Sequence, residues 1–116
     1  MTTSAALSEQ WIEICAVSDL IPNSGVTALL GDTQIAIFYL PKEEQTLFAL
    51  DNHDPFSKSN TLSRGIVGDL KDQLVVAAPI YKQHFNLMTG QCLEDESVTL
   101  RTYAVKLVGE KVHVAI

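Results

Sequence analysis

The feature that most constrains this chain is its series of short apolar runs, none of which keeps a helical period over a long stretch. In several runs apolar and polar residues alternate, as they do on a half-buried strand. The expected strands are residues 11–16, 26–30, 33–40, 46–50, 74–78, 84–87, 104–108 and 111–116. Gly31-Asp32 and Gly109-Glu110 are typical of tight turns between paired strands. The pattern predicts an all-β fold, a sandwich or small barrel of short antiparallel strands.

Composition excludes several classes of protein. At 116 residues, with 47% hydrophobic residues and a formal net charge of −6, the chain is typical of one soluble domain. Its eight Lys and Arg residues are spread along the sequence, which argues against a nucleic-acid-binding face. No apolar run approaches the length of a bilayer span, and the N-terminus lacks the parts of a secretory signal. We therefore expect a cytoplasmic domain over residues 10–116, a flexible segment over residues 1–9, and reduced, buried Cys15 and Cys92.

One expected connection, residues 53–73, is much longer than the others. Loops of this length in compact domains are usually functional or disordered. This one carries apolar residues that can pack against the body of the domain, namely Leu62, Ile66, Val67 and Leu70. We therefore expect an ordered, functional loop. None of its serines is paired with a visible base, so no catalytic residue is predicted.

Two stretches, FALDNHDPFSKSN (48–60) and VVAAPIYKQHFNLMTGQC (75–92), resemble the pattern of a Rieske domain. In that pattern two loops at one end of a β-sandwich each supply one Cys and one His to a [2Fe–2S] cluster. Aligning Pro55 and Pro79 with the prolines of the pattern places the four ligand positions on Asp54, Phe56, Ala78 and Tyr81. None of these residues is Cys or His. The resemblance therefore implies a Rieske-like β-sandwich with two long loops at one end and no cluster.

The replacements suggest how the loops are filled. We expect the rings of Phe56 and Tyr81 to occupy the space of a cluster, with Ala78 leaving room for them. Asp54 is expected to accept a hydrogen bond from the Tyr81 hydroxyl or from N–H groups of its own loop. A lone metal ion held by Asp54 with His53 and His84 remains the alternative.

The resemblance extends to a narrower family. With DNHDPFS (51–57), LSRGIVGD (62–69) and PIYKQHFNLMTGQCLED (79–95), the chain resembles the small subunit of assimilatory NADH-dependent nitrite reductase over about residues 10–116. That resemblance implies an accessory subunit without its own cofactor, not catalytic alone but needed for activity of the complex. The complex reduces nitrite to ammonium in nitrate assimilation. Its large subunit, the implied partner, carries FAD, sirohaem and an iron–sulfur cluster.

Two other functions stay open at this point: a protein-interaction module of another redox complex, and an electron-transfer domain with atypical metal ligands. For docking on a partner we expect the two loops to supply the contact, through His53, Lys58, Arg64, Lys82 and His84. The acidic residues 94–96 belong to a different segment, so the loop end is expected to be locally positive in an acidic chain.

Overall fold

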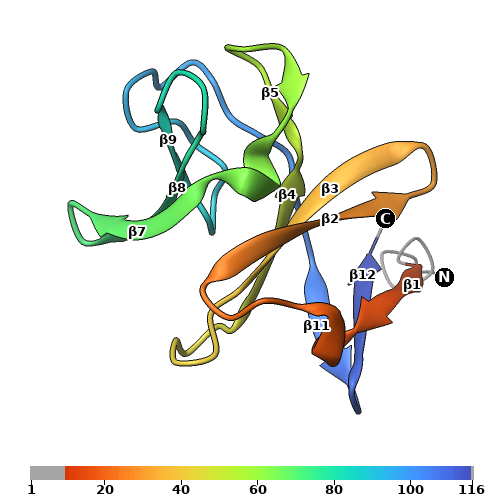
Figure 1. Cartoon of the computed structure of the whole chain (residues 1–116). Helices are drawn as coiled ribbons and strands as arrows, with labels where there is room; N and C mark the ends of the chain where they lie inside the picture. The colour runs from red at the N-terminus through yellow and green to blue at the C-terminus, as the bar shows by residue number, and fades with distance from the viewer. Residues whose placement is uncertain (1–9, 116) are drawn as a thin grey trace, which may run out of the picture.

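The computed structural model describes residues 10–115, and its strands are short and antiparallel (Figure 1). In chain order they are β1 (Trp11–Ala16), β2 (Ser24–Leu30), β3 (Thr33–Tyr39), β4 (Leu47–Asp51), β5 (His53–Asp54), β6 (Ser59–Asn60), β7 (Ile66–Leu70), β8 (Gln73–Ala77), β9 (His84–Asn86), β10 (Thr102–Tyr103), β11 (Val105–Val108) and β12 (Lys111–Ala115). Two single 3-10 turns, η1 (Val17–Asp19) and η2 (Leu62–Arg64), are the helical elements of this range. The predicted all-β class is confirmed.

The centre of the molecule is a four-stranded sheet in the order β10-β4-β3-β2. Its longest pairing, β2 with β3, turns at Gly31-Asp32 as predicted, with Leu30 opposite Thr33. Gly31 has φ +63°, a conformation that glycine adopts without steric cost. β3 is rich in β-branched and aromatic residues, which suit a pleated surface that is covered on both sides.

Alternate residues of β3 face two different cores. Ala36 and Phe38 belong to a core cluster on one side of the sheet, together with residues of β8 and β9. Ile35 and Ile37 belong to a second cluster on the other side, together with Val112 and Val114 of β12. The period-2 geometry of a strand produces this division, so the central sheet is the middle layer of the fold.

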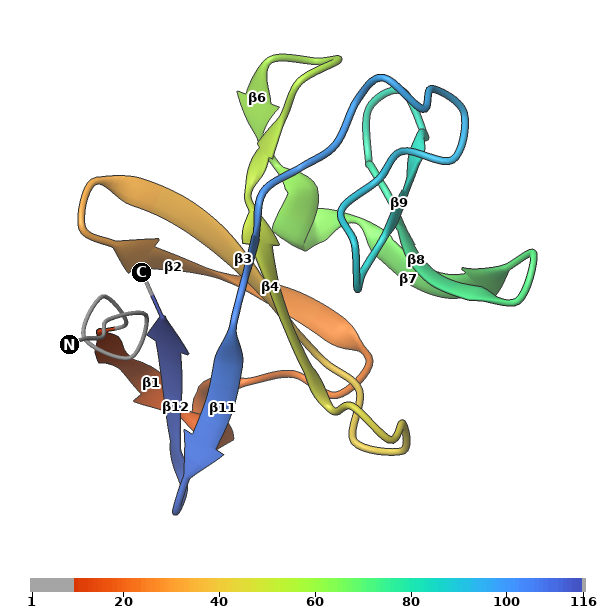
Figure 2. The ribbon, with the colours of Figure 1, turned by 180° about the vertical axis from the view of Figure 1, so that it is seen from behind.

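The second core is closed by a three-stranded sheet in the order β1-β12-β11. The two ends of the described chain meet here, since Trp11 pairs with Ala115. Figure 2 shows this sheet on the opposite side of the molecule from β7, β8 and β9. The hairpin turn expected at Gly109-Glu110 is present between β11 and β12. The expected flexible segment, residues 1–9, lies outside the described residues.

The first core is closed by a three-stranded sheet in the order β7-β8-β9 and by the β5–β6 hairpin. Residues 53–73, expected to be a loop, therefore contain strands and one 3-10 turn. Leu62 and Val67 pack on the core as predicted, but Ile66 is 74% exposed. The prediction for Ile66 was wrong because it lies on β7, where neighbouring side chains point to opposite faces.

Candidate functional site

The first loop, residues 53–64, is organised by the carboxylate of Asp54, whose side chain is fully buried. Asp54 Oδ1 accepts the N–H of Phe56 at 2.9 Å, and Oδ2 accepts the hydroxyl of Ser57 at 2.9 Å. The N–H of Lys58 donates to the Asp54 carbonyl at 2.7 Å and closes the turn. Of the two partners expected for Asp54, the loop N–H is confirmed. Its carboxylate thus holds this turn by short local hydrogen bonds.

Asn52, which the sequence reasoning missed, anchors the first loop to the central sheet. Its side chain is fully buried, and its Nδ2 donates to the Gln34 side chain at 3.2 Å and to the Asn60 carbonyl at 3.0 Å. Its Oδ1 accepts the N–H of Ser63 at 2.7 Å. The available signal was a small polar residue placed directly after the buried run of β4, where side-chain hydrogen bonds commonly fix a loop.

The second loop, residues 78–84, joins β8 to β9 and closes in the same manner as the first. The N–H of Lys82 donates to the Ala78 carbonyl at 3.1 Å, four residues back, as Lys58 does to Asp54. The N–H of Ala78 donates to the Gln83 carbonyl at 2.9 Å. Ala78 is fully buried against the first core. The two loops together are called the loop end below, and Figure 1 shows both at the same end of the molecule.

The interior between the two loops is filled by Phe56 and not by Tyr81. Phe56 packs against the first core with its ring centroid 6.1 Å from that of Phe85. Tyr81 is 61% exposed, so the predicted packing of its ring and its hydrogen bond to Asp54 are wrong. The physical reason is that Phe85, which is fully buried, already occupies the space beside Phe56 and Ala78. The Tyr81 ring therefore lies on the surface.

The two loop-end histidines have local partners. His53 is exposed, and its Nδ1 lies 3.0 Å from the Asn60 Oδ1. The N–H of His84 donates to Glu94 Oε1 at 2.7 Å, and its Nδ1 lies 2.7 Å from Oε2. Burial opposes ionisation of the Glu94 carboxyl, but the hydrogen bonds from His84 outweigh it and lower its pKa. The expectation that residues 94–96 lie away from the loops was thus wrong for Glu94.

Three exposed cations remain at the loop end: Lys58, Arg64 and Lys82. Within residues 10–115 none of the three forms an ion pair, the pairs there being His84–Glu94 and Lys111–Glu13. Exposed apolar side chains lie beside them, with Ile66 74% and Ile80 50% exposed. The loop end is therefore a mixed surface of cations and apolar groups with carboxylates at its border, Glu94 beside His84 and the pair Asp32 and Asp51 beside His53.

The residues present do not fit a [2Fe–2S] centre. Such a centre needs two thiolates and two imidazoles, whereas Phe56 and Ala78 have no donor atom and the Asp54 carboxylate is fully buried and occupied by its own loop. The alternative lone-metal set does not assemble either, because His53, Asp54 and His84 each have a different partner. Among the described residues no group of three or more His, Cys, Asp or Glu side chains is placed to hold a metal ion.

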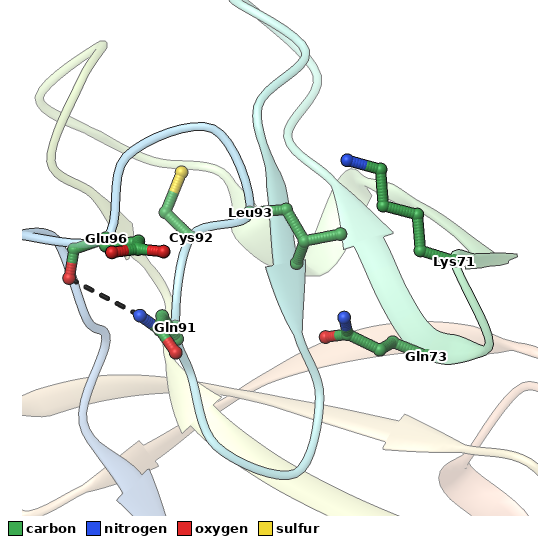
Figure 3. A pocket seen from close by; sticks show the side chains of 6 residues that line it. All are labelled: Lys71, Gln73, Gln91, Cys92, Leu93 and Glu96. Carbon is green, nitrogen blue, oxygen red and sulfur yellow. Dashed lines mark hydrogen bonds between the residues drawn. The ribbon is translucent and has the colours of Figure 1, made fainter.

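A small pocket lies between the turn that joins β7 to β8 and the segment that follows β9 (Figure 3). Its volume is about 180 Å³, and its lining residues are Lys71, Gln73, Gln91, Cys92, Leu93 and Glu96. Gln91 Nε2 donates to the Glu96 carbonyl at 3.5 Å across one side. Burial raises the pKa of the Cys92 thiol, which favours its protonated form. Cys15 and Cys92 are both free; Cys92 is buried as expected, whereas the expected burial of Cys15 was wrong, since it is only half-buried.

Comparison with known proteins places this geometry in a family. Residues 10–115 match the family model described as a Rieske-like [2Fe–2S] domain. The chain is 44% identical to the nitrite reductase (NADH) small subunit of Escherichia coli K12 over 98 residues, 84% of this chain and 90% of that one. The chain belongs to the Rieske-like family of NADH nitrite reductase small subunits. The predicted resemblance is thereby confirmed.

Two further similar proteins show the fold of the family and its occurrence within a larger chain. The NMR structure of the E. coli protein NirD is 41% identical, superimposes with a TM-score of 0.84, and covers 93% of this chain and 97% of that one. The nitrite reductase [NAD(P)H] large subunit of Klebsiella oxytoca is 36% identical over 107 residues, which are 92% of this chain and 11% of that protein. A domain of the small-subunit family is thus present within a large-subunit chain of that organism. Neither helical turn of residues 10–115 is long or apolar enough to cross a membrane.

Proposed function

We propose that this chain is the accessory small subunit of a cytoplasmic NADH-dependent nitrite reductase, which it assists by binding and without a redox centre of its own. The observation that carries the proposal is the 44% identity to the E. coli small subunit over 84% of the chain. The second support is chemical, since the ligand positions of a Rieske centre hold Asp54, Phe56, Ala78 and Tyr81. A domain with these side chains acts through its surface.

The partner in this proposal is the large subunit of the reductase, which carries FAD, sirohaem and an iron–sulfur cluster and reduces nitrite to ammonium in nitrate assimilation. The Klebsiella large subunit supports the pairing, because it contains a domain of this kind in one chain with the rest of the protein. Two domains that work together in one chain in one organism are commonly separate, associating subunits in another.

The loop end is the proposed docking surface on this chain. Exposed apolar and aromatic side chains beside Arg, with a charged rim, are typical of protein–protein interfaces. The loop end combines exposed Ile80 and Tyr81 with Arg64, Lys58 and Lys82, and exposed Ile66 lies next to it. His53, which is exposed, and His84, which is half-buried, belong to the same surface. The ends of the described chain lie in the β1-β12-β11 sheet, which leaves the loop end free when this domain is joined covalently to a large subunit.

The experiment is reconstitution from separately purified subunits. The large subunit is assayed for NADH-dependent nitrite reduction with and without this chain, and the iron content and visible spectrum of this chain are measured. We expect a colourless chain without stoichiometric iron that binds the large subunit and raises its activity. Full activity of the large subunit alone would contradict the accessory role. Stoichiometric iron in this chain would contradict the absence of a redox centre.

A further inference from the structure

The two loops carry lysines at matching positions. Lys58 and Lys82 each stand four residues after a ligand position, and each donates its N–H to the carbonyl of that residue, at 2.7 Å for Asp54 and 3.1 Å for Ala78. Each has a left-handed backbone, with φ +59° for Lys58 and +66° for Lys82. Each side chain is exposed. The loops therefore present one ammonium group apiece from the same backbone turn.

A lysine at such a position is unfavourable for the fold itself. The left-handed region suits glycine and, next best, asparagine, whereas a side chain such as lysine is disfavoured there. Within residues 10–115 neither ammonium group pairs with a carboxylate, and neither lysine belongs to a core cluster. The local structure would be satisfied equally well by glycine or asparagine. What the two lysines add is positive charge at the tips of both loops, in a chain whose formal net charge is −6.

A third lysine with a left-handed backbone lies outside the two loops. Lys71, with φ +53°, lies with Asp72 in the tight turn between β7 and β8, where both residues have positive φ. This turn is at the far end of the β7–β8 hairpin from the second loop (Figure 1). The Lys71 conformation follows from the geometry of a two-residue hairpin turn. It therefore serves as an internal control for the pair.

We propose that Lys58 and Lys82 are a matched pair of cations that bind acidic side chains on the large subunit and fix the orientation in which the loop end docks. The inference rests on the proposed function, since it names the chemistry by which the same partner is recognised. Ile80 and Tyr81, both exposed, lie directly before Lys82 and supply apolar contact beside the charges. In an acidic chain, two cations at one end favour the single orientation in which that end meets an acidic patch.

The test compares two double variants that remove the same charge. Lys58→Asn with Lys82→Asn removes the matched pair and places asparagine where the backbone is left-handed. Lys42→Asn with Lys71→Asn is the control, because Lys42 is exposed in the turn between β3 and β4 and Lys71 in that between β7 and β8. Association with the purified large subunit is measured by surface plasmon resonance at low and high salt. The melting temperature of each variant is measured alongside.

We expect the loop variant to melt no lower than wild type and to associate about tenfold more slowly at low salt, with the difference nearly lost at about 0.5 M salt. The control variant should associate like wild type. Wild-type binding by the loop variant overturns the matched-pair proposal and leaves the proposed function intact. Equal slowing of both variants also overturns it, since net charge alone would then explain the effect. Failure of the wild-type chain to bind the large subunit counts against the proposed function itself.

Discussion

At the scale of single residues, only one of the two aromatic rings expected between the loops packs there. Phe56 packs on Phe85 and the first core, whereas Tyr81 stands outside with 61% of its surface exposed. Burial of apolar area by Phe56 therefore stabilises the contact between the loops. Tyr81 makes no comparable contribution, so its surface remains available to a partner.

Truncating each ring to alanine distinguishes the contributions of Phe56 and Tyr81 to stability. Phe56→Ala should lower the free energy of unfolding by about 2 kcal/mol, less than for a fully buried phenylalanine because Phe56 is half-buried. Tyr81→Ala should change it by less than about 0.5 kcal/mol, as exposed substitutions do. Urea denaturation of both variants measures the difference. Equal losses would mean that both rings pack between the loops, as the sequence alone suggested.

Part of this arrangement could be predicted from the sequence. The resemblance to the Rieske pattern, aligned at Pro55 and Pro79, singles out Asp54, Phe56, Ala78 and Tyr81 and shows that none of the four is Cys or His. The direction of a ring does not follow from spacing. Whether Tyr81 enters or leaves the interior depends on how much space Phe56 and Phe85 already take, which is a property of the packed core.

At the scale of elements, β9 is joined to the segment after it by backbone hydrogen bonds and by the contact of His84 with Glu94. The Glu94 carboxylate accepts both the backbone N–H and a ring nitrogen of His84. Sequence patterns predict strands and turns, but they do not predict that Glu94, ten residues after His84, lies against β9. For the same reason β5, β6 and β7 were not expected inside residues 53–73, whose polar sequence is typical of a loop.

Acid should weaken this link in a defined direction. The pKa of Glu94 is lowered in the folded chain from its ordinary value of 4.5, where hydrogen bonds from His84 outweigh the opposing effect of burial. The carboxylate therefore stabilises the fold fully above about pH 4.5, and this contribution is lost as the pH falls through the lowered pKa. Glu94→Gln keeps an acceptor oxygen but removes the charge. The wild type should be the more stable in urea at neutral pH, and the difference should vanish in acid; a difference independent of pH would exclude the charge as its cause.

The turn at Gly90 fixes how the segment after β9 packs against the rest of the chain. Gly90 has φ +79°, and a Cβ added there would lie 2.1 Å from the carbonyl oxygen of Leu100. Gly90→Ala should therefore cost more than about 3 kcal/mol, from both backbone strain and overlap. Gly31→Ala is the control, because Gly31 has φ +63° with nothing within 4 Å of an added Cβ. Gly31→Ala should cost only about 1 kcal/mol. Thermal melts of both variants measure whether steric overlap destabilises the fold in addition to the strain of a positive φ.

At the scale of the whole molecule, the central sheet couples two cores that share no side chain. β3 sends alternate residues to each side, and β4 does the same, with Phe48 and Leu50 in the first core and Leu47 and Ala49 in the second. Loss of either core exposes one face of the same strands. The all-β class followed from the sequence, but this three-layer arrangement did not, because alternation shows that a strand has two faces and not which sheet covers each.

The shared sheet predicts that the described chain unfolds as one unit, even though the loop end and the terminal sheet lie on opposite sides. Phe38 faces the first core, beside β8 and β9. Trp11 lies in β1, in the sheet that closes the second core, with Lys106 Nζ 4.1 Å from its ring centroid. As the single tryptophan of the chain, Trp11 reports on the side that Phe38 does not touch.

Phe38→Leu should lower the free energy of unfolding by about 1–2 kcal/mol, because it removes part of a fully buried ring. If the sheet couples both cores, the urea midpoint followed by Trp11 fluorescence shifts as far as the midpoint followed by far-ultraviolet circular dichroism. The conservative variant Ile37→Val, on the opposite face of the same strand, should shift both midpoints together as well. If Phe38→Leu moved the circular dichroism transition and left the Trp11 transition in place, the loop end would be an independently unfolding unit. In that case the docking surface could unfold while the β1-β12-β11 sheet stayed folded. If the two cores are coupled, Lys58 and Lys82 instead keep fixed positions relative to the rest of the described chain.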